Sequence, residues 1–324
     1  MKSQPDTTFA GLAHLISPPT DIADHAALIA TIDRMAAESA SSDNLRAEVR
    51  TLMEDTLRTG KAKVREALLA RPHAGLRAAR GYTHLMDCVV AGITHLAIEH
   101  LHPQPVRTKG QQLSVVAVGG YGRGEMAPFS DVDLLFLTPY KQTAWSESVI
   151  ESMLYMLWDL KLKVGQSTRS VDDCIRLARE DFTIRTALLE KRFIAGDAAP
   201  FGELDTRLWR ELFDKTGPEF VEAKMSERDS RHERHGGSRY LLEPNLKESK
   251  GGLRDLQTLH WISKYLYHTG TAWDLVEMGV FEQEEVQRFA DASKFIWAVR
   301  CHLHDLSGRA QEQLTFDRQV EIAE

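Results

Sequence analysis

The residues of this sequence best suited to chemistry are two aspartates that follow a glycine-rich turn. Asp131 and Asp133 stand in the stretch SDVDLLFL, shortly after the run GGYGRGE that begins at Gly119. Side chains of a strand alternate between its two faces, so both carboxylates are expected on one face. Two neighbouring carboxylates repel each other unless a cation lies between them. Oxygen ligands of this kind suit Mg²⁺, which is often held by one or two carboxylates together with substrate phosphates.

The glycine-rich turn adds features that a nucleotide would need. Gly119 and Gly120 leave backbone N–H groups open to a triphosphate, and Ser130 is a further candidate for phosphate contact. Arg123 is the candidate for stabilising charge on a leaving pyrophosphate. A strand, two glycines and an Asp-x-Asp on the next strand together predict two-metal nucleotidyl transfer. Taken singly, either motif also fits a structural hairpin, and the run lacks the spacing of a dinucleotide fold or a P-loop.

A third carboxylate is expected in a site of this kind. Asp159 is the candidate, because it comes just before a possible third strand. The alternative is that Asp159 ends a helix and pairs with Lys161 or Lys163. The aspartate pair at 172–173 is a weaker candidate and is expected to cap a helix.

Hydrophobic periodicity predicts helices around one small sheet in the middle of the chain. Apolar residues recur at helical spacing over 21–80, with a plausible helix stop at Gly60, and beyond residue 171 almost everything is expected to be helical. Further helices are expected over 82–100 and 145–160, and short apolar runs predict strands over 113–118, 132–137 and 163–169.

A second polar cluster follows in the sequence LEPNLKESKGGLRD. Its two glycines, Gly251 and Gly252, are expected to open a helix, and helix N-termini attract anions. Lys247 and Arg254 are therefore candidates for contact with phosphates or a base. The alternative is a solvated loop in which Arg254 pairs with Asp255 or with Glu248.

The dipeptide His304-Asp305 is the one found in metal-dependent phosphohydrolases. No separate upstream histidine and downstream aspartate complete a ligand set, so the pair is expected to lie on the surface of a regular helix.

The composition argues against several classes of protein: nucleic-acid binders, disulfide-rich or zinc-binding domains, and membrane proteins. The chain has 324 residues, 43% of them hydrophobic, and a net charge of −7, which argues against binding nucleic acid by bulk charge. Three widely spaced cysteines fit neither a disulfide framework nor a zinc site. The sequence shows no signal peptide and no apolar run long enough to span a membrane, so a cytoplasmic protein is expected.

The segment VAVGGYGRGEMAPFSDVDLLFL resembles the nucleotidyltransferase motif of bacterial protein-PII uridylyltransferase/uridylyl-removing enzymes, members of the polymerase-β-like superfamily. The stretches WDLKLKVGQSTRS, LEPNLKESKGGLRDLQTLHWI and LHDLSGRAQEQLTFDRQVEIAE extend the resemblance from about residue 50 to the C-terminus. Gln166 stands where the family has His, and Lys250 where it has Pro or a small residue. Neither departure falls on the expected metal ligands.

The resemblance implies an α+β fold, with a small mixed sheet flanked by helical segments. It implies a helical segment over 1–80, a nucleotidyltransferase core over 81–175 and a helical domain over 176–324 that completes the nucleotide site. Family members continue into HD and ACT domains, so this chain is expected to be an N-terminal fragment without uridylyl removal or glutamine sensing.

The activity that the resemblance implies is Mg²⁺-dependent transfer of UMP from UTP to a tyrosine of the PII signal protein, with release of pyrophosphate. Asp131 and Asp133 would hold metal. UTP and PII are the expected partners, with no nucleic acid and no membrane. Two alternatives stay open: transfer of AMP or another nucleotide to a different acceptor, and a non-catalytic module that binds nucleotide or PII.

Overall fold

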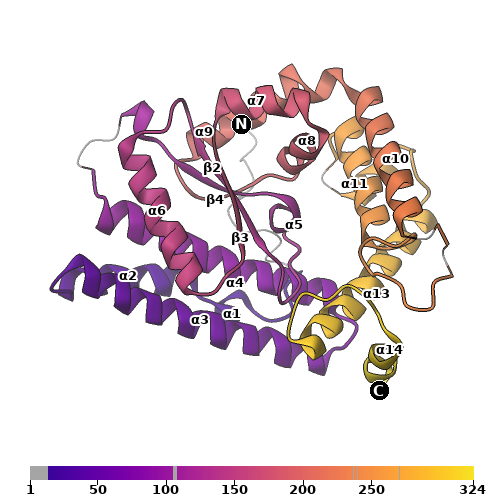
Figure 1. The fold of residues 1–324 in the computed structure, drawn as a ribbon, viewed down its shortest axis with the longest axis horizontal. Helices are drawn as coiled ribbons and strands as arrows, with labels where there is room; N and C mark the ends of the chain where they lie inside the picture. Colours follow the sequence, from indigo (N-terminus) through magenta and orange to yellow (C-terminus); the bar gives the residue numbers. More distant parts are fainter. Residues whose placement is uncertain (1–13, 105–107, 236, 239, 270) are drawn as a thin grey trace. The chain divides into compact units, whose positions relative to one another are not determined.

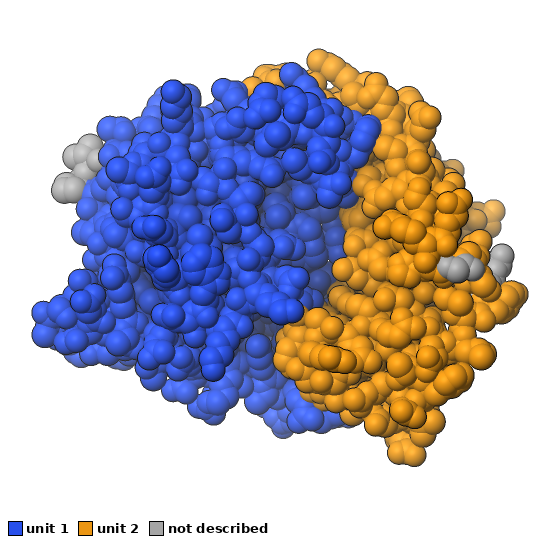
Figure 2. All heavy atoms as spheres, in the orientation of Figure 1, with its two compact units in different colours: residues 1–70, 77–126, 130–206 blue, residues 71–76, 127–129, 207–324 orange. Residues whose placement is uncertain are grey.

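The computed structural model describes residues 14–104, 108–235, 237–238, 240–269 and 271–324 (Figure 1). The chain forms two compact units, drawn in blue and orange in Figure 2: residues 1–70, 77–126 and 130–206, and residues 71–76, 127–129 and 207–324. Residues 1–13 of the expected N-terminal helical segment lie outside the described residues. The expected divisions after residues 80 and 175 differ from these limits. A strand over residues 192–196 pairs with the central sheet, so the first unit continues past residue 175.

The first unit combines helices with one four-stranded sheet. Two of its helices, Gly75–His95 and Ala198–Glu211, each have one end among residues assigned to the second unit. Its elements are α1 (Pro19–Ile22), α2 (His25–Glu38), α3 (Ser42–Ala70), α4 (Gly75–His95), the π-helix η2 (Leu96–Leu101), the 3-10 helix η3 (Lys109–Gln111), β1 (Ser114–Ala117), α5 (Gly119–Gly122), β2 (Val132–Thr138), α6 (Ala144–Asp159), β3 (Val164–Ser170), α7 (Val171–Glu180), α8 (Phe182–Leu189), β4 (Arg192–Gly196) and α9 (Ala198–Glu211).

The sheet has the strand order β3-β2-β1-β4. β1 pairs antiparallel with β2 and β4, whereas β2 and β3 run parallel and are joined through α6. The three predicted strands are confirmed to within one or two residues. The expectation that almost everything beyond residue 171 is helical is wrong at β4. This five-residue edge strand opens with an arginine, and its sequence has no clear alternation.

α4 is the central helix of the first unit. Every residue from 81 to 94 is buried, including the polar Thr83, His84, Asp87 and Thr94. Gly60 does not end a helix, because α3 runs through it. A Cβ at Gly60 would lie 2.5 Å from Leu85 Cδ1 and 2.8 Å from the carbonyl oxygen of Ile22. This glycine therefore allows neighbouring segments to approach α3 closely.

The second unit is helical among its described residues and holds an aromatic core. Phe220 stacks on Tyr265 with ring centroids 3.9 Å apart, and Phe213 lies 4.9 Å from the same ring. Its elements are the 3-10 helix η4 (Phe213–Lys215), α10 (Gly217–Arg234), α11 (Leu253–Tyr267), α12 (Ala272–Glu277), α13 (Gln283–Ser307) and α14 (Phe316–Ala323).

The predicted fold class, α+β with a small mixed sheet among many helices, is confirmed by this architecture. Within the described residues, no helix has the length and hydrophobicity needed to cross a membrane.

Candidate functional site

The hairpin of β1 and β2 brings the glycine-rich turn next to the aspartates. Ala117 at the end of β1 pairs with Leu134 near the start of β2, and the Val118 N–H donates to the Asp133 carbonyl oxygen at 3.1 Å. The chain then turns sharply into the short helix α5. Gly119 has a φ of +59°, a left-handed conformation that favours glycine. The antiparallel register therefore positions Gly119 beside Asp133, although the two are far apart in the sequence.

The carboxylate of Asp133 lies between two glycines. A Cβ at Gly119 would be 3.4 Å from Asp133 Oδ2. On the other side, β3 runs parallel to β2 and pairs Gly165 with Asp133. A Cβ at Gly165 would come within 3.0 Å of Asp133 Oδ1, closer than real Cβ atoms lie to a neighbour. The absence of a side chain at Gly165 therefore lets the Asp133 carboxylate lie directly against β3.

The alternation along β2 places the two aspartates as expected. Val132 and Leu134 are each only 1% exposed and belong to the core. Asp133 between them is half-buried, and Asp131, just before the strand, is exposed. Ser130 precedes Asp131 in the segment that leads into β2. The structure therefore brings Asp133 beside the turn at Gly119, while Ser130 and Asp131 lie in the segment that leads into β2.

The donor set of this cluster fits Mg²⁺. Asp131 and Asp133 offer carboxylate oxygens, the ligands that Mg²⁺ prefers. Among the described residues, no group of three ligating side chains within 4.8 Å of one another includes these aspartates. Two carboxylates with further oxygens supplied by a substrate would be the arrangement that Mg²⁺ commonly accepts.

Arg123 is held inside the first unit. Its guanidinium donates to Glu190 Oε2 at 2.8 Å and to Glu125 Oε2 at 3.3 Å, and only 11% of the side chain is exposed. Burial lowers the pKa of Arg123, but the two carboxylates outweigh it and raise this pKa. To contact a pyrophosphate, the Arg123 guanidinium would have to use donors that are not already bonded to Glu125 and Glu190. The guanidinium also lies next to Gly120, 3.6 Å from where a Cβ would be.

A second buried arginine holds the turn itself. Arg192, the first residue of β4, makes a bidentate ion pair with Asp87 of α4 at 2.8 and 3.0 Å. It also donates to the carbonyl oxygens of Tyr121 at 3.0 Å and Gly122 at 3.3 Å. The pair therefore links α4, β4 and the glycine-rich turn. Sequence reasoning missed it, because the partners are 105 residues apart and no local motif marks them.

Replacing Arg192 by Met should destabilise the first unit by about 3–5 kcal/mol, because it leaves the fully buried Asp87 carboxylate without its cation. Urea denaturation measures the loss. Arg176→Met is the control: its side chain is 57% exposed and its ion pairs lie at the surface, so the change should be within about 1 kcal/mol. Equal losses for the two variants would contradict a clamping role for Arg192.

The structure does not show Asp159, the predicted third carboxylate, beside the other two aspartates. It is the exposed last residue of α6 and lines a surface pocket with Asp43, Arg46 and Arg50 of α3. Neither Asp131 nor Asp133 lines that pocket. The neighbouring strand β3 (VGQSTRS) carries no carboxylate, and Gly165 is the residue opposite Asp133.

We therefore expect Asp159→Asn to keep nucleotidyl transfer within about tenfold of the unmodified chain, a loss below about 1.4 kcal/mol. The rate at which label passes from an α-labelled nucleoside triphosphate to the protein acceptor measures this loss. A loss as large as that of Asp133→Asn would instead make Asp159 part of the site.

The cluster around PNLKESKGGLRD forms a compact loop in the second unit. Asn245 Oδ1 accepts from the backbone N–H groups of Lys247 and Glu248 at 3.0 and 2.8 Å. The N–H groups of Leu253 and Arg254 donate back to the carbonyls of residues 246 and 247, each at 2.9 Å. A Cβ at Gly252 would lie 2.8 Å from two carbonyl oxygens of this loop. The expected helix opening at these glycines is confirmed by α11.

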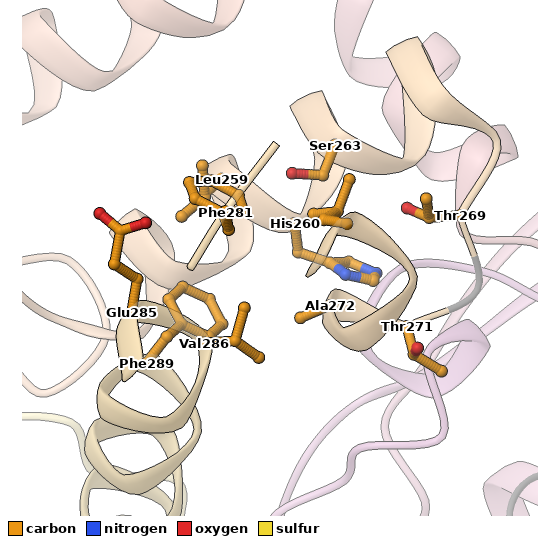
Figure 3. A pocket seen from close by; sticks show the side chains of 11 residues that line it. Leu259, His260, Ser263, Thr269, Thr271, Ala272, Phe281, Glu285, Val286 and Phe289 are labelled. Carbon is orange, nitrogen blue, oxygen red and sulfur yellow. The ribbon is translucent and has the colours of Figure 1, made fainter. Parts of the chain in front are cut away.

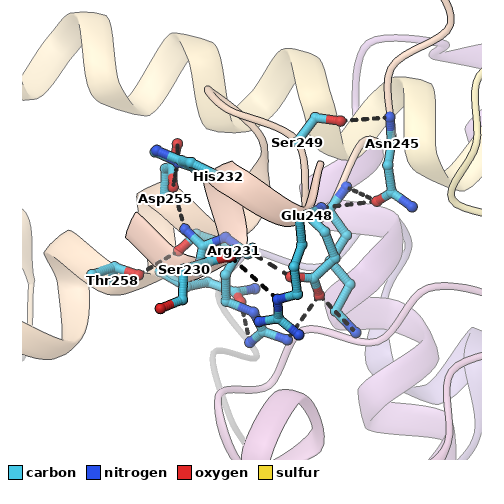
Figure 4. Close-up of polar contacts among 12 residues, drawn as sticks. Ser230, Arg231, His232, Asn245, Glu248, Ser249, Asp255 and Thr258 are labelled. Carbon is cyan, nitrogen blue, oxygen red and sulfur yellow. Dashed lines mark hydrogen bonds and ion pairs between the residues drawn. The ribbon is translucent and has the colours of Figure 1, made fainter. Parts of the chain in front are cut away.

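The charged side chains of this loop form an ion-pair network (Figure 4). Arg254 donates to Glu248 Oε1 at 3.3 Å and to Gln257 Oε1 at 3.0 Å, so of the two partners considered, Glu248 is the one found. Asp255 instead accepts from Arg231 of α10 and the Gly251 N–H and contacts His232.

Lys247 lies among charged groups of both signs, with Glu248 and Glu312 as well as two arginines nearby. Burial lowers the pKa of Lys247, and nearby Arg254 and Arg300 lower it further. An anion bound here would relieve that repulsion, which is the property expected of a phosphate contact. The sequence-predicted residues Lys247 and Arg254 thus share one cluster within the second unit.

The pair His304-Asp305 lies on the regular helix α13, as expected, but not at its surface. His304 is fully buried, and its Nε2 lies 3.5 Å from Glu312 Oε1. Glu312 also accepts from Arg300 at 2.9 and 3.0 Å, while its backbone carbonyl accepts from the Leu246 N–H. The histidine therefore belongs to a buried network that supports the loop at residues 245–254.

That network predicts acid sensitivity. Burial alone would raise the pKa of Glu312, but hydrogen bonds from His304 and Arg300 lower it from 4.5 to about 2. Because the folded-state pKa is depressed, the stabilisation is complete above pH 4.5 and is lost as the pH falls towards 2. It amounts to on the order of 3 kcal/mol. Urea denaturation at neutral and acid pH should show this loss, and Glu312→Gln should flatten the dependence; an unchanged profile would contradict it.

An apolar cavity of about 250 Å³ lies elsewhere in the second unit (Figure 3). Leu259 and His260 of α11 line it together with Val286 and Phe289 of α13. Its lining is mostly apolar, so it does not suit a triphosphate.

Two family models match parts of this chain. Residues 219–324 match the family model described as GlnD PII-uridylyltransferase. Residues 7–160, which include the glycine-rich turn and both aspartates, match the model described as glutamate-ammonia ligase adenylyltransferase.

Similar proteins cover almost the whole chain. A bifunctional uridylyltransferase/uridylyl-removing enzyme of Ruegeria pomeroyi is 55% identical over 93% of this chain and 33% of its own length. Proteins of the same description from Cereibacter sphaeroides and Rhodospirillum rubrum are 52% and 48% identical over 98% and 95% of this chain. The chain spans about a third of the length of these relatives, at 33–34%. Over most of its length, the chain is therefore homologous to bifunctional uridylyltransferase/uridylyl-removing enzymes.

Proposed function

We propose that this chain carries the nucleotidyl-transferring part of such an enzyme, and that it transfers UMP from UTP to a tyrosine of PII with release of pyrophosphate. The observation that carries the proposal is the Asp133 carboxylate between Gly119 and Gly165, with Asp131 beside it. Such a carboxylate pair beside a glycine-rich turn would suit a cation together with phosphates.

Each part of the cluster has a distinct task. Asp131 and Asp133 would hold Mg²⁺, which when bound supplies positive charge to polarise phosphoryl oxygens. Gly119 and Gly120 begin a helical turn, and its first N–H groups, which have no partner within a helix, would be donors to phosphate oxygens. Arg192 fixes the turn by binding two of its carbonyl oxygens.

The reaction would be a direct displacement. The acceptor oxygen bonds to the α-phosphorus as the bond to pyrophosphate breaks, and the hydroxyl proton leaves to solvent. A covalent intermediate on cysteine is disfavoured, because all three cysteines are buried and burial raises the pKa of each thiol to about 12.

A second candidate is adenylyl transfer, which the match of residues 7–160 to the adenylyltransferase model supports. A panel of α-labelled UTP, ATP, CTP and GTP with purified PII separates the two. PII with its acceptor tyrosine replaced by phenylalanine serves as the control. Label from UTP that requires the tyrosine supports the proposal, whereas label from ATP overturns the choice of nucleotide.

A further inference from the structure

A cluster of two histidines and one aspartate lies in the first unit, outside the site described above. Asp33 comes from α2, and His95 and His100 lie at the end of α4 and in η2. His95 Nε2 lies 2.6 Å and His100 Nε2 2.8 Å from the same atom, Asp33 Oδ1. The ligand atoms of all three side chains lie within 4.8 Å of one another.

The π-helix is what brings the two histidines together. Residues five apart do not face each other on an α-helix, where neighbours are three or four apart. In η2 the backbone hydrogen bonds span five residues, as in the bond from the His102 N–H to the Ala97 carbonyl at 3.0 Å. This spacing places His95 and His100 on one side of the helix. Such π-segments are rare and often occur at functional sites.

We propose that Asp33, His95 and His100 form a binding site for a first-row divalent transition metal, with Zn²⁺ as the reference ion. Two imidazole nitrogens and one carboxylate oxygen are a donor set that suits such ions, whereas Mg²⁺ prefers oxygen ligands alone. The site is therefore chemically distinct from Asp131 and Asp133.

The three ligand atoms, which lie within 4.8 Å of one another, would have to adjust to accept the ion. Zn²⁺ binds nitrogen and oxygen at about 2.0–2.2 Å, which separates tetrahedral ligands by roughly 3.3 Å. The Asp33 carboxylate would have to move away from the two histidine nitrogens by a few tenths of an ångström. It can do so because half of its side chain is exposed. The histidines, about a quarter exposed at 25% and 23%, are anchored by the helix yet reachable from solvent.

Binding of Zn²⁺ tests the proposal directly. The whole 324-residue chain is stripped of metal and titrated with Zn²⁺ by calorimetry at neutral pH, in an excess of Mg²⁺ that occupies carboxylate-only sites. We expect one Zn²⁺ per chain, and at least tenfold weaker affinity in His95→Gln, in His100→Gln and in Asp33→Asn. Asp33 is the safest of these positions for folding, because its side chain is half exposed.

His102→Gln is the matched control. His102 lies just beyond η2 but binds Ser152 Oγ at 2.8 Å instead of Asp33, so its replacement should leave Zn²⁺ affinity unchanged. Circular dichroism verifies that each variant is folded. Absence of Zn²⁺ binding, or equal affinity in the unmodified chain and the His95→Gln, His100→Gln double variant, would overturn the proposal.

Discussion

Asp133→Asn is expected to lower the rate of nucleotidyl transfer by at least about 10³-fold. The substitution removes a charged ligand of the proposed metal, whose positive charge would stabilise the transition state by several kcal/mol. Asp131→Asn should have a comparable effect. Both side chains lie at the turn end of the β1–β2 hairpin, Asp131 exposed and Asp133 half-buried, so the free energy of unfolding should change little. The rate of label transfer and urea denaturation measure the two quantities.

The control for charge alone is Asp43→Asn. The Asp43 side chain is 89% exposed on α3, and its replacement changes the net charge by the same amount. Its turnover should equal that of the unmodified chain. Near-normal turnover in the Asp131→Asn, Asp133→Asn double variant would refute the assignment of these aspartates to the site.

Gly165→Ala is expected to lower turnover by at least about 10²-fold, the scale of loss that follows a misplacement of about 1 Å. The added methyl group would collide with Asp133 Oδ1 and push the carboxylate away. Gly165 is exposed and its φ is not positive, so the substitution should leave the fold intact. The Mg²⁺ concentration needed for half-maximal rate should rise.

Gly202→Ala is the matched control, because nothing lies within 4 Å of a Cβ at that position in α9. A sharper test combines Gly165→Ala with Asp133→Asn. If the glycine acts through the aspartate, the double variant should be no slower than Asp133→Asn alone. Additive losses would show that Gly165 acts by another route.

Local sequence signals were sufficient for the centre of the sheet. The runs LSVVAV and VDLLFL are short, apolar and bounded by turn residues, and the glycines between them mark the turn. Alternation along the second run then orients Asp131 and Asp133 correctly. The same reasoning misread Gly60, because a glycine that permits close packing has the same sequence appearance as one that ends a helix.

The contacts that support the site could not be predicted, since they join residues far apart in the chain. Arg192 meets Asp87 only because β4 lies beside β1 and near α4. Gly165 meets Asp133 only through the parallel register of β3. Asp159 was chosen for its place in the sequence, but α6 ends in a different pocket.

The most direct test of the central claim is transfer of label from α-labelled UTP to purified PII by the 324-residue chain, with and without Mg²⁺. The structure-based account predicts label on PII that requires both Mg²⁺ and Asp133. Tight binding of PII without any label from any nucleotide would contradict it and identify the chain as a non-catalytic binding module.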